Sequence, residues 1–399
     1  MLSLRLARGA HPLVLLRRLL VALAAAGVGF LLLCTLGYAA AHPARTEESV
    51  VRLLWCAVPL AAVVQFAVTV ARSDPATRPR DGLDAAGFGP VRLSLLAATS
   101  TAISCGLGSA AALLTYLELR GSLGTTPFSG SAAAVLDGRA TLPWGATLTL
   151  LGLLPALAAG ACAVLLRPRK QPTGRAPETT ASGEPLPERR PAYAGLPWGV
   201  AVIAMGLALE AYVGHAPAPQ PSALLALPGR QGAASPGLLG GWLLASVGLV
   251  LAGPGLTHWC GVLLAAGRPG AMRLLAGRIL QDAATRIGRP LGVVCAVAAA
   301  ALACAELYGA AWEHSGPRPF GPLTGLGAAV VMACATATAI TAALDARTLR
   351  GETTEALLRL GIPPSLLRGA AAVRTCVLLA ALAPLTWVIA ELAALPLTR

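Results

Sequence analysis

The sequence predicts an all-α membrane protein that crosses the bilayer several times. Fifty-six per cent of its 399 residues are hydrophobic and 12% are charged, whereas charged residues make up about a quarter of a soluble domain. The mean hydropathy is +0.69. Apolar runs of about 20 residues, each long enough to cross a bilayer as a helix, recur along the chain. A transmembrane β-barrel would instead have short segments of alternating hydrophobicity.

Nine apolar runs are long enough to be transmembrane helices. They cover residues 19–41, 51–71, 93–119, 142–166, 196–214, 237–266, 290–311, 320–344 and 370–397. The first run could also be a secretory signal peptide, because four arginines precede it and small residues follow it. Its apolar core is longer than the roughly 7–15 residues of a signal peptide, so a retained helix is expected.

Basic residues predict the orientation of these spans. Twenty-three Lys and Arg residues lie in the N-terminal segment and in alternate loops, and seven lie on the other side. Because basic loops remain in the cytoplasm, the N-terminus is expected there and the C-terminus outside the cell membrane. The net charge of +13 then reflects topology and contact with the lipid bilayer. A nucleic-acid-binding function is therefore excluded.

The nine spans form groups of four, two and three. Residues 1–166 contain the first four. The stretch 167–195 is rich in Pro, Gly, Ser, Thr and charge, which predicts a flexible cytoplasmic linker. Residues 196–266 contain two connecting spans, and residues 267–399 contain the last three.

A short motif occurs twice, in two loops on the predicted cytoplasmic side. "DGLDAAGFGPVRLSL" (81–95) follows the second span, and "EALLRLGIPPSLLRG" (355–369) follows the eighth. They align without a gap at an offset of 274, which places Asp81, Leu83, Gly87, Pro90 and Leu93 on Glu355, Leu357, Gly361, Pro364 and Leu367. Basic amphipathic segments also precede the first and seventh spans. Spans 1–3 and 7–9 are therefore predicted to be an internal parallel repeat.

Each motif is expected to form a short helix joined to the following span. In the second copy, Gly361 can end one or two helical turns, because glycine adopts the left-handed conformation found after helix ends. Pro364 can begin the next helix, because the first helical position needs no N–H. A soluble partner that holds such a helix could move the attached span. The alternative is an interfacial helix that rests on lipid.

At these residues the chain resembles the FtsX-like permease family, the membrane subunits of type VII ABC systems. The family signature is an acidic residue, then Leu, Gly, Pro or a polar residue, and Leu, between the second and third helices of a four-helix unit. Both copies of the motif match it. The resemblance covers nearly the whole chain and implies one unit in residues 1–166 and a second in residues 267–399. It also implies that the ten aligned residues contact an ABC ATP-binding subunit, which is expected to be a dimer.

The chain departs from the family pattern at two places. Family members usually carry a large extracytoplasmic domain, whereas the loops after the first and seventh spans are only about ten residues long here. The second unit also stops after three helices, so we expect either that its last helix is missing or that the chain is truncated. Capture of substrate by an extracytoplasmic domain is therefore not expected.

Motifs for catalysis are absent from the sequence. It contains no G-x-x-x-x-G-K-[ST], H-E-x-x-H or G-x-S-x-G. The nine cysteines lie within apolar runs without C-x-x-C spacing, as expected of small packing residues, and His258 is likewise expected to pack within its span. We therefore expect no enzymatic activity, cofactor or metal site in this chain, and ATP hydrolysis in a partner.

Four glutamates lie near the predicted outer ends of their spans: Glu118, Glu210, Glu306 and Glu391. Charges within a membrane are costly and often functional. These carboxylates could form an acidic vestibule for a cationic or amphipathic substrate, or they could only reach the lipid headgroups. The main alternative function is an ion-coupled secondary transporter that uses Glu210, Glu306 or Arg374 as a coupling group. A non-transporting membrane scaffold is the third possibility.

Overall fold

A computed structural model of the chain describes residues 12–73, 90–122, 143–167, 195–214, 236–267, 270–313, 322–348 and 363–398, together with residues 351, 355, 358, 359 and 361. Every long regular element within this part of the chain is an α-helix. Nine of these helices are long and apolar enough to cross a membrane. The prediction of an all-α polytopic membrane protein is therefore confirmed.

Each helix matches one predicted span, with ends that differ by several residues. The helices are α2 (Pro12–Ala41), α3 (Thr46–Ser73), α5 (Pro90–Arg120), α6 (Trp144–Leu165), α7 (Gly195–Gly214), α8 (Pro236–Ala265), α9 (Ala271–Glu313), α10 (Pro322–Thr348) and α12 (Pro364–Thr398). The largest difference is in α9, where the predicted amphipathic segment and the seventh span form one continuous helix of 43 residues. The predicted linker lies mostly outside the described residues.

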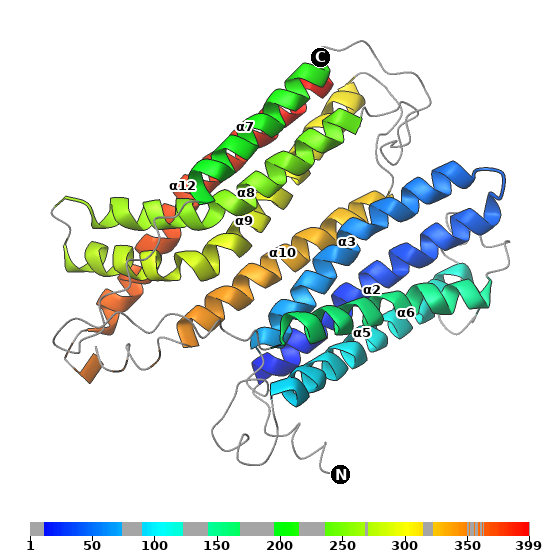
Figure 1. The fold of residues 1–399 in the computed structure, drawn as a ribbon, viewed down its shortest axis with the longest axis horizontal. Helices are drawn as coiled ribbons and strands as arrows, with labels where there is room; N and C mark the ends of the chain where they lie inside the picture. The colour runs from blue at the N-terminus through cyan, green and yellow to red at the C-terminus, as the bar shows by residue number, and fades with distance from the viewer. Residues whose placement is uncertain are drawn as a thin grey trace, which may run out of the picture.

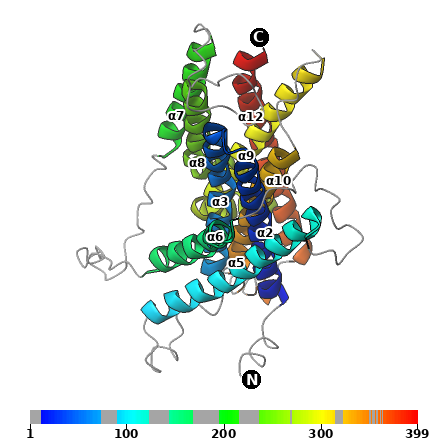
Figure 2. The same ribbon diagram turned by 90° about the vertical axis from the view of Figure 1, so that its right-hand side faces the viewer.

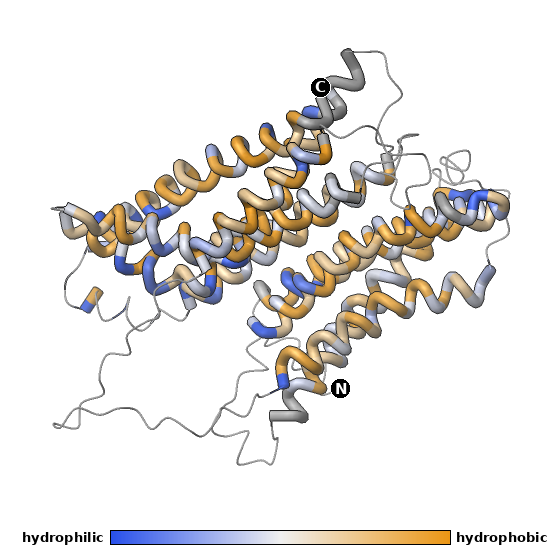
Figure 3. The backbone as a smooth tube through the Cα atoms, turned by 45° about the horizontal axis from the view of Figure 1, so that its top comes forward, coloured by the Kyte–Doolittle hydropathy of each residue, from blue (hydrophilic) through white to orange (hydrophobic). Residues whose placement is uncertain are grey.

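The outward faces of the helices are apolar. Leu107, Leu148 and Trp198 are 65%, 63% and 71% exposed, and many other large apolar side chains are similarly exposed. In water such surfaces would promote association, whereas in a bilayer they contact lipid chains while the backbone is satisfied within each helix. Figure 3 shows apolar residues along most of each helix, with polar residues concentrated towards helix ends.

The helices form two groups (Figures 1 and 2). In the first group, α2 packs mainly on α5 and α3, and α6 packs on α5 and α3. In the second group, α8 packs on both α7 and α9, and α12 packs mainly on α9. Helix α10 lies between the groups, since it contacts α9 on one side and α3 and α2 on the other.

Small residues, such as those of the patch at residues 106–112, allow close helix packing. A Cβ atom on Gly108 would collide with the backbone oxygen of Ala22 in α2, and Ala112 of the same patch is buried. Gly253 of α8 and Gly288 of α9 meet in the same way. Close backbone approach replaces hydrophobic burial as the source of packing energy between membrane helices.

The cysteines are free thiols, and all are buried except Cys304, which is half-buried, and Cys376, which is exposed. Burial among apolar side chains agrees with their predicted role as small packing residues.

The connection between α2 and α3 is short and ordered. It comprises residues 42–45, and the backbone N–H of His42 donates to the Tyr38 carbonyl at 3.0 Å. The guanidinium of Arg52 lies 3.5 Å from the centre of the Tyr38 ring. This loop therefore contains no additional domain, as its length in the sequence indicates.

Candidate functional site

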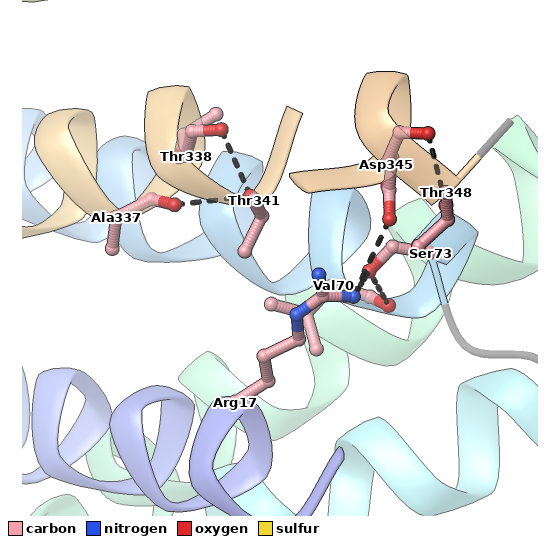
Figure 4. Close-up of polar contacts among 8 residues, drawn as sticks. All are labelled: Arg17, Val70, Ser73, Ala337, Thr338, Thr341, Asp345 and Thr348. Carbon is pink, nitrogen blue, oxygen red and sulfur yellow. Dashed lines mark hydrogen bonds and ion pairs between the residues drawn. The ribbon is translucent and has the colours of Figure 1, made fainter. Parts of the chain in front are cut away.

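Arg17 of α2 joins the ends of two other helices (Figure 4). Its Nη1 atom donates a hydrogen bond to Ser73 Oγ at 2.9 Å and lies 3.5 Å from Asp345 Oδ1. The side chains of Arg17 and Asp345 are only 13% and 25% exposed. A largely buried guanidinium requires such partners, because an unpaired buried charge is strongly unfavourable. We call these three residues the Arg17 bridge.

The Arg17 bridge lies at the ends of the two helices that precede the two copies of the motif in the sequence. Ser73 is the last residue of α3, and the segment with the first copy follows it. Asp345 lies in the last turn of α10, and the segment with the second copy follows that helix. One guanidinium therefore links the two helix ends from which the predicted coupling segments depart. We call this end of the molecule the basic end, after Arg17 and its neighbour Arg18.

The second copy of the motif has the predicted turn at its centre. Residues 355, 358 and 359 are helical, and the N–H of Gly361 donates to the Leu358 carbonyl at 3.0 Å. Gly361 has φ +85°, a left-handed conformation that glycine adopts without steric cost. Its position and conformation confirm that Gly361 ends the short helical segment.

In the second copy of the motif, the described residues of the short helical segment are exposed. Glu355 and Arg359 form an i,i+4 ion pair at 3.9 Å, with side chains 70% and 84% exposed, so the pair contributes little to stability. Leu358 is 43% exposed, Pro364 is exposed and Leu367 is half-buried. Leu357 lies outside the described residues. The exposed charged and apolar side chains that the structure describes in this segment are thus accessible to a partner or to lipid headgroups.

The helices that follow the two motifs begin at aligned prolines. Helix α12 begins at Pro364, as the sequence predicts, and α5 begins at Pro90. These are equivalent positions in the predicted repeat, since their numbers differ by the same offset of 274 as the rest of the motif. Asp81, Leu83 and Gly87 lie outside the described residues, and the side chains of Pro90 and Leu93 are not described either.

The amphipathic part of α9 packs within the protein at the basic end. Its buried residues Ala276, Leu280, Ala283 and Ala284 recur at the spacing of one helical face. Gly277 meets the backbone of α8 near Gly261. At the start of α12, a Cβ atom on Gly369 would lie 2.8 Å from Met272 Sδ. Ala370 of α12 also packs with Leu264 of α8 and Ala276 of α9, so the start of α12 is held against both helices. The sequence indicates the apolar face but not these glycine contacts.

The four glutamates do not form one continuous cluster. Glu118 lies on α5, which packs on α2 and α6, whereas the other three lie on α7, α9 and α12 of the second group. Glu306 is exposed, and Glu118 and Glu391 are half-buried. Glu210 is completely buried, so it neither faces an open vestibule nor extends to the headgroups in this conformation. An acidic vestibule stays a prediction for the others.

Two further residues that the sequence analysis names are partly buried in their helices. Arg374 is half-buried on α12, and His258 is half-buried on α8. Among the residues that the structure describes, no group of three or more His, Cys, Asp and Glu side chains could hold a metal ion.

Comparison with protein-family models, with curated proteins and with solved structures finds no match to this chain.

Proposed function

We propose that the chain is the permease subunit of an ABC transporter, similar to FtsX-like permeases. In this proposal it lies in the cell membrane with its N-terminus in the cytoplasm, and it converts ATP hydrolysis by a separate dimeric ATPase into movement of its own helices. That movement drives export or transmits a mechanical signal. The chain itself is not an enzyme.

The observation that carries the proposal is the matched start of α5 and α12. Both helices begin at the aligned prolines of the two motifs, so a short segment precedes an equivalent helix in each half. Gly361 gives the second segment a fixed change of direction immediately before α12. A segment joined to its helix by so short a connection transmits displacement to that helix, because neither a helix nor one tight turn stretches appreciably.

Helix pairing supports the internal repeat within this proposal. Helix α2 packs on α3 and α5, and α9 packs on α10 and α12. In the predicted repeat these are the same pairs, with the first helix of each set between the second and third. The second helices, α3 and α10, also contact each other, so the two halves meet through equivalent elements close to the Arg17 bridge.

Co-purification tests the proposal. The chain would be produced with an ABC ATPase encoded beside it, and the complex isolated from detergent or nanodiscs. Leu83→Asp with Leu357→Asp is expected to abolish ATPase retention and stimulation, because a few buried apolar anchors dominate small contacts of this kind. Leu83→Met with Leu357→Met is the matched control and should retain the ATPase. Retention and stimulation by the Asp double variant would refute the coupling role.

An ion-coupled transporter is the second candidate function, and the burial of Glu210 favours it. Buried ionisable groups within membrane helices frequently belong to ion pathways. Transport by the chain alone in liposomes, driven by an ion gradient without ATP or ATPase, would support this candidate over the ABC permease.

A further inference from the structure

Helices α7 and α8 pack along a line of glycines. Gly241, Gly248 and Gly255 of α8 are spaced by seven residues and face α7. A Cβ atom on Gly248 would lie 2.8 Å from the carbonyl oxygen of Gly199. A Cβ atom on Gly206 would lie 2.7 Å from the carbonyl oxygen of Gly241. A spacing of seven keeps one side of a helix against its partner, so the two backbones are close along this glycine seam.

Glu210 lies in the glycine seam near the end of α7 that is opposite the basic end. It is completely buried, and neither carboxyl oxygen has a hydrogen-bond partner among the described residues. Its Cγ atom occupies the space where a Cβ atom on Gly241 would lie. The Glu210 Oε1 atom and the Gly206 carbonyl oxygen lie 3.1 and 2.9 Å from that same point. The missing side chain of Gly241 thus makes room for a carboxyl group among oxygens and apolar atoms.

Among the described residues, the helices around Glu210 carry no basic side chain near this end of the seam. Helix α8 contains neither Lys nor Arg, and its titratable residues His258 and Cys260 lie near its other end. The titratable residues towards the corresponding ends of the other helices in this group are Glu391 on α12 and Cys304, Glu306, Tyr308 and Glu313 on α9, together with the exposed Tyr212 of α7, and none of them is basic. An ionised, unpaired carboxylate buried in this environment would be strongly unfavourable.

We propose that Glu210 is a proton-binding site whose occupancy is coupled to the separation of α7 and α8. The protonated carboxylic acid fits the closed seam. When the two helices separate and water enters, the O–H bond dissociates, the proton passes to water, and the carboxylate is solvated. Because the closed seam binds the proton and the open seam releases it, low pH favours closure and high pH favours opening. The proposal goes beyond the ABC permease and does not require an ATPase.

Infrared spectroscopy of the whole chain in nanodiscs tests the protonated state. An exposed glutamate ionises near pH 4.3, about three units below neutral. Because Glu210 is buried without a partner in the closed seam, wild-type protein is expected to retain the carbonyl-stretch band of a protonated carboxyl group even at neutral pH. Glu210→Gln should lose this band, and Glu306→Gln should keep it, because Glu306 is exposed. The absence of the band in wild type at neutral pH, or its survival in Glu210→Gln, would overturn the proposal. The wild-type measurement decides even if a variant fails to insert.

Hydrogen–deuterium exchange tests the coupling to helix separation. Exchange of the α7 and α8 segments around Glu210 and Gly241, corrected for the intrinsic effect of pH, would be followed from neutral to alkaline pH. Opening in wild type is expected to increase by up to about tenfold per pH unit once the open state ionises. Glu210→Gln should abolish this dependence while Glu306→Gln preserves it. An unchanged pH dependence in Glu210→Gln, or opening that responds to sodium and not to pH, would refute the proton site.

Discussion

Replacement of Arg17 by alanine is expected to destabilise the basic end of the molecule by about 2 kcal/mol. Its Nη1 atom makes a 2.9 Å hydrogen bond to Ser73 and lies 3.5 Å from Asp345. Two unit charges about 4 Å apart attract by about 4 kcal/mol at an effective dielectric constant of about 20, but desolvation offsets much of this. A hydrogen bond from a charged donor adds about 1.5–3 kcal/mol when it is lost.

A double-mutant cycle isolates the ion pair from the rest of the Arg17 bridge. Arg17→Ala, Asp345→Ala and the double variant would be unfolded in mixed detergent micelles, and a coupling energy of about 1 kcal/mol is expected for this partly buried pair. Arg17→Lys keeps the charge but loses the forked donor geometry, so an intermediate loss is expected. Arg347→Ala, at an exposed position on the same end of α10, is the control and should change stability by less than about 0.5 kcal/mol.

A coupling energy between Arg17 and Asp345 that is indistinguishable from zero would contradict this prediction. A loss of stability in Arg17→Ala no larger than that in Arg347→Ala would contradict it too. Either result would mean that the contact between α2, α3 and α10 is maintained by apolar packing alone, and that the bridge does not hold the two helix ends together.

Three further perturbations test other parts of the structure. Gly206→Ala should lower the free energy of unfolding by about 1–3 kcal/mol, since backbone atoms of α8 lie 2.7 Å from the added Cβ atom; Gly152→Ala, with no atom within 4 Å, is the control in the same unfolding assay. Gly361→Val should introduce about 1–3 kcal/mol of backbone strain at φ +85° and reduce ATPase stimulation at unchanged abundance. Reporter fusions should give a cytoplasmic signal after Arg167 and an external signal at Arg399, and a cytoplasmic signal at Arg399 would contradict the predicted orientation.

The helices are predictable from the sequence because each apolar run is long enough to satisfy its backbone within the membrane. The starts of α5 and α12 follow from the properties of proline at a first helical position. The continuity of α9 is harder to predict. Pro290 lies at the point where the amphipathic segment meets the apolar span and would ordinarily mark a helix boundary. The close packing of Gly253 and Gly288 against each other holds α8 and α9 together across this position.

The rotation of α7 about its axis could not be predicted. Its sequence is apolar on all sides, so no amphipathic pattern indicates which face lies inward. The position of Glu210 along the helix therefore predicts a residue near the membrane edge, while its burial depends on the face that meets α8. The signal that could have identified this face is the recurrence of Gly199 and Gly206 in α7 at the same seven-residue spacing as the glycines of α8.

The Arg17 bridge is not predictable from local sequence either, because its partners are 56 and 328 residues away. Its location nevertheless has a mechanical consequence for the proposed function. If an ATPase dimer holds both motif segments, movement of one segment relative to the other changes the separation between the ends of α3 and α10. A guanidinium bonded to Ser73 and paired with Asp345 resists that change only while both contacts persist. The bridge would therefore make the two segments move together up to the point at which one contact breaks, and independently beyond it.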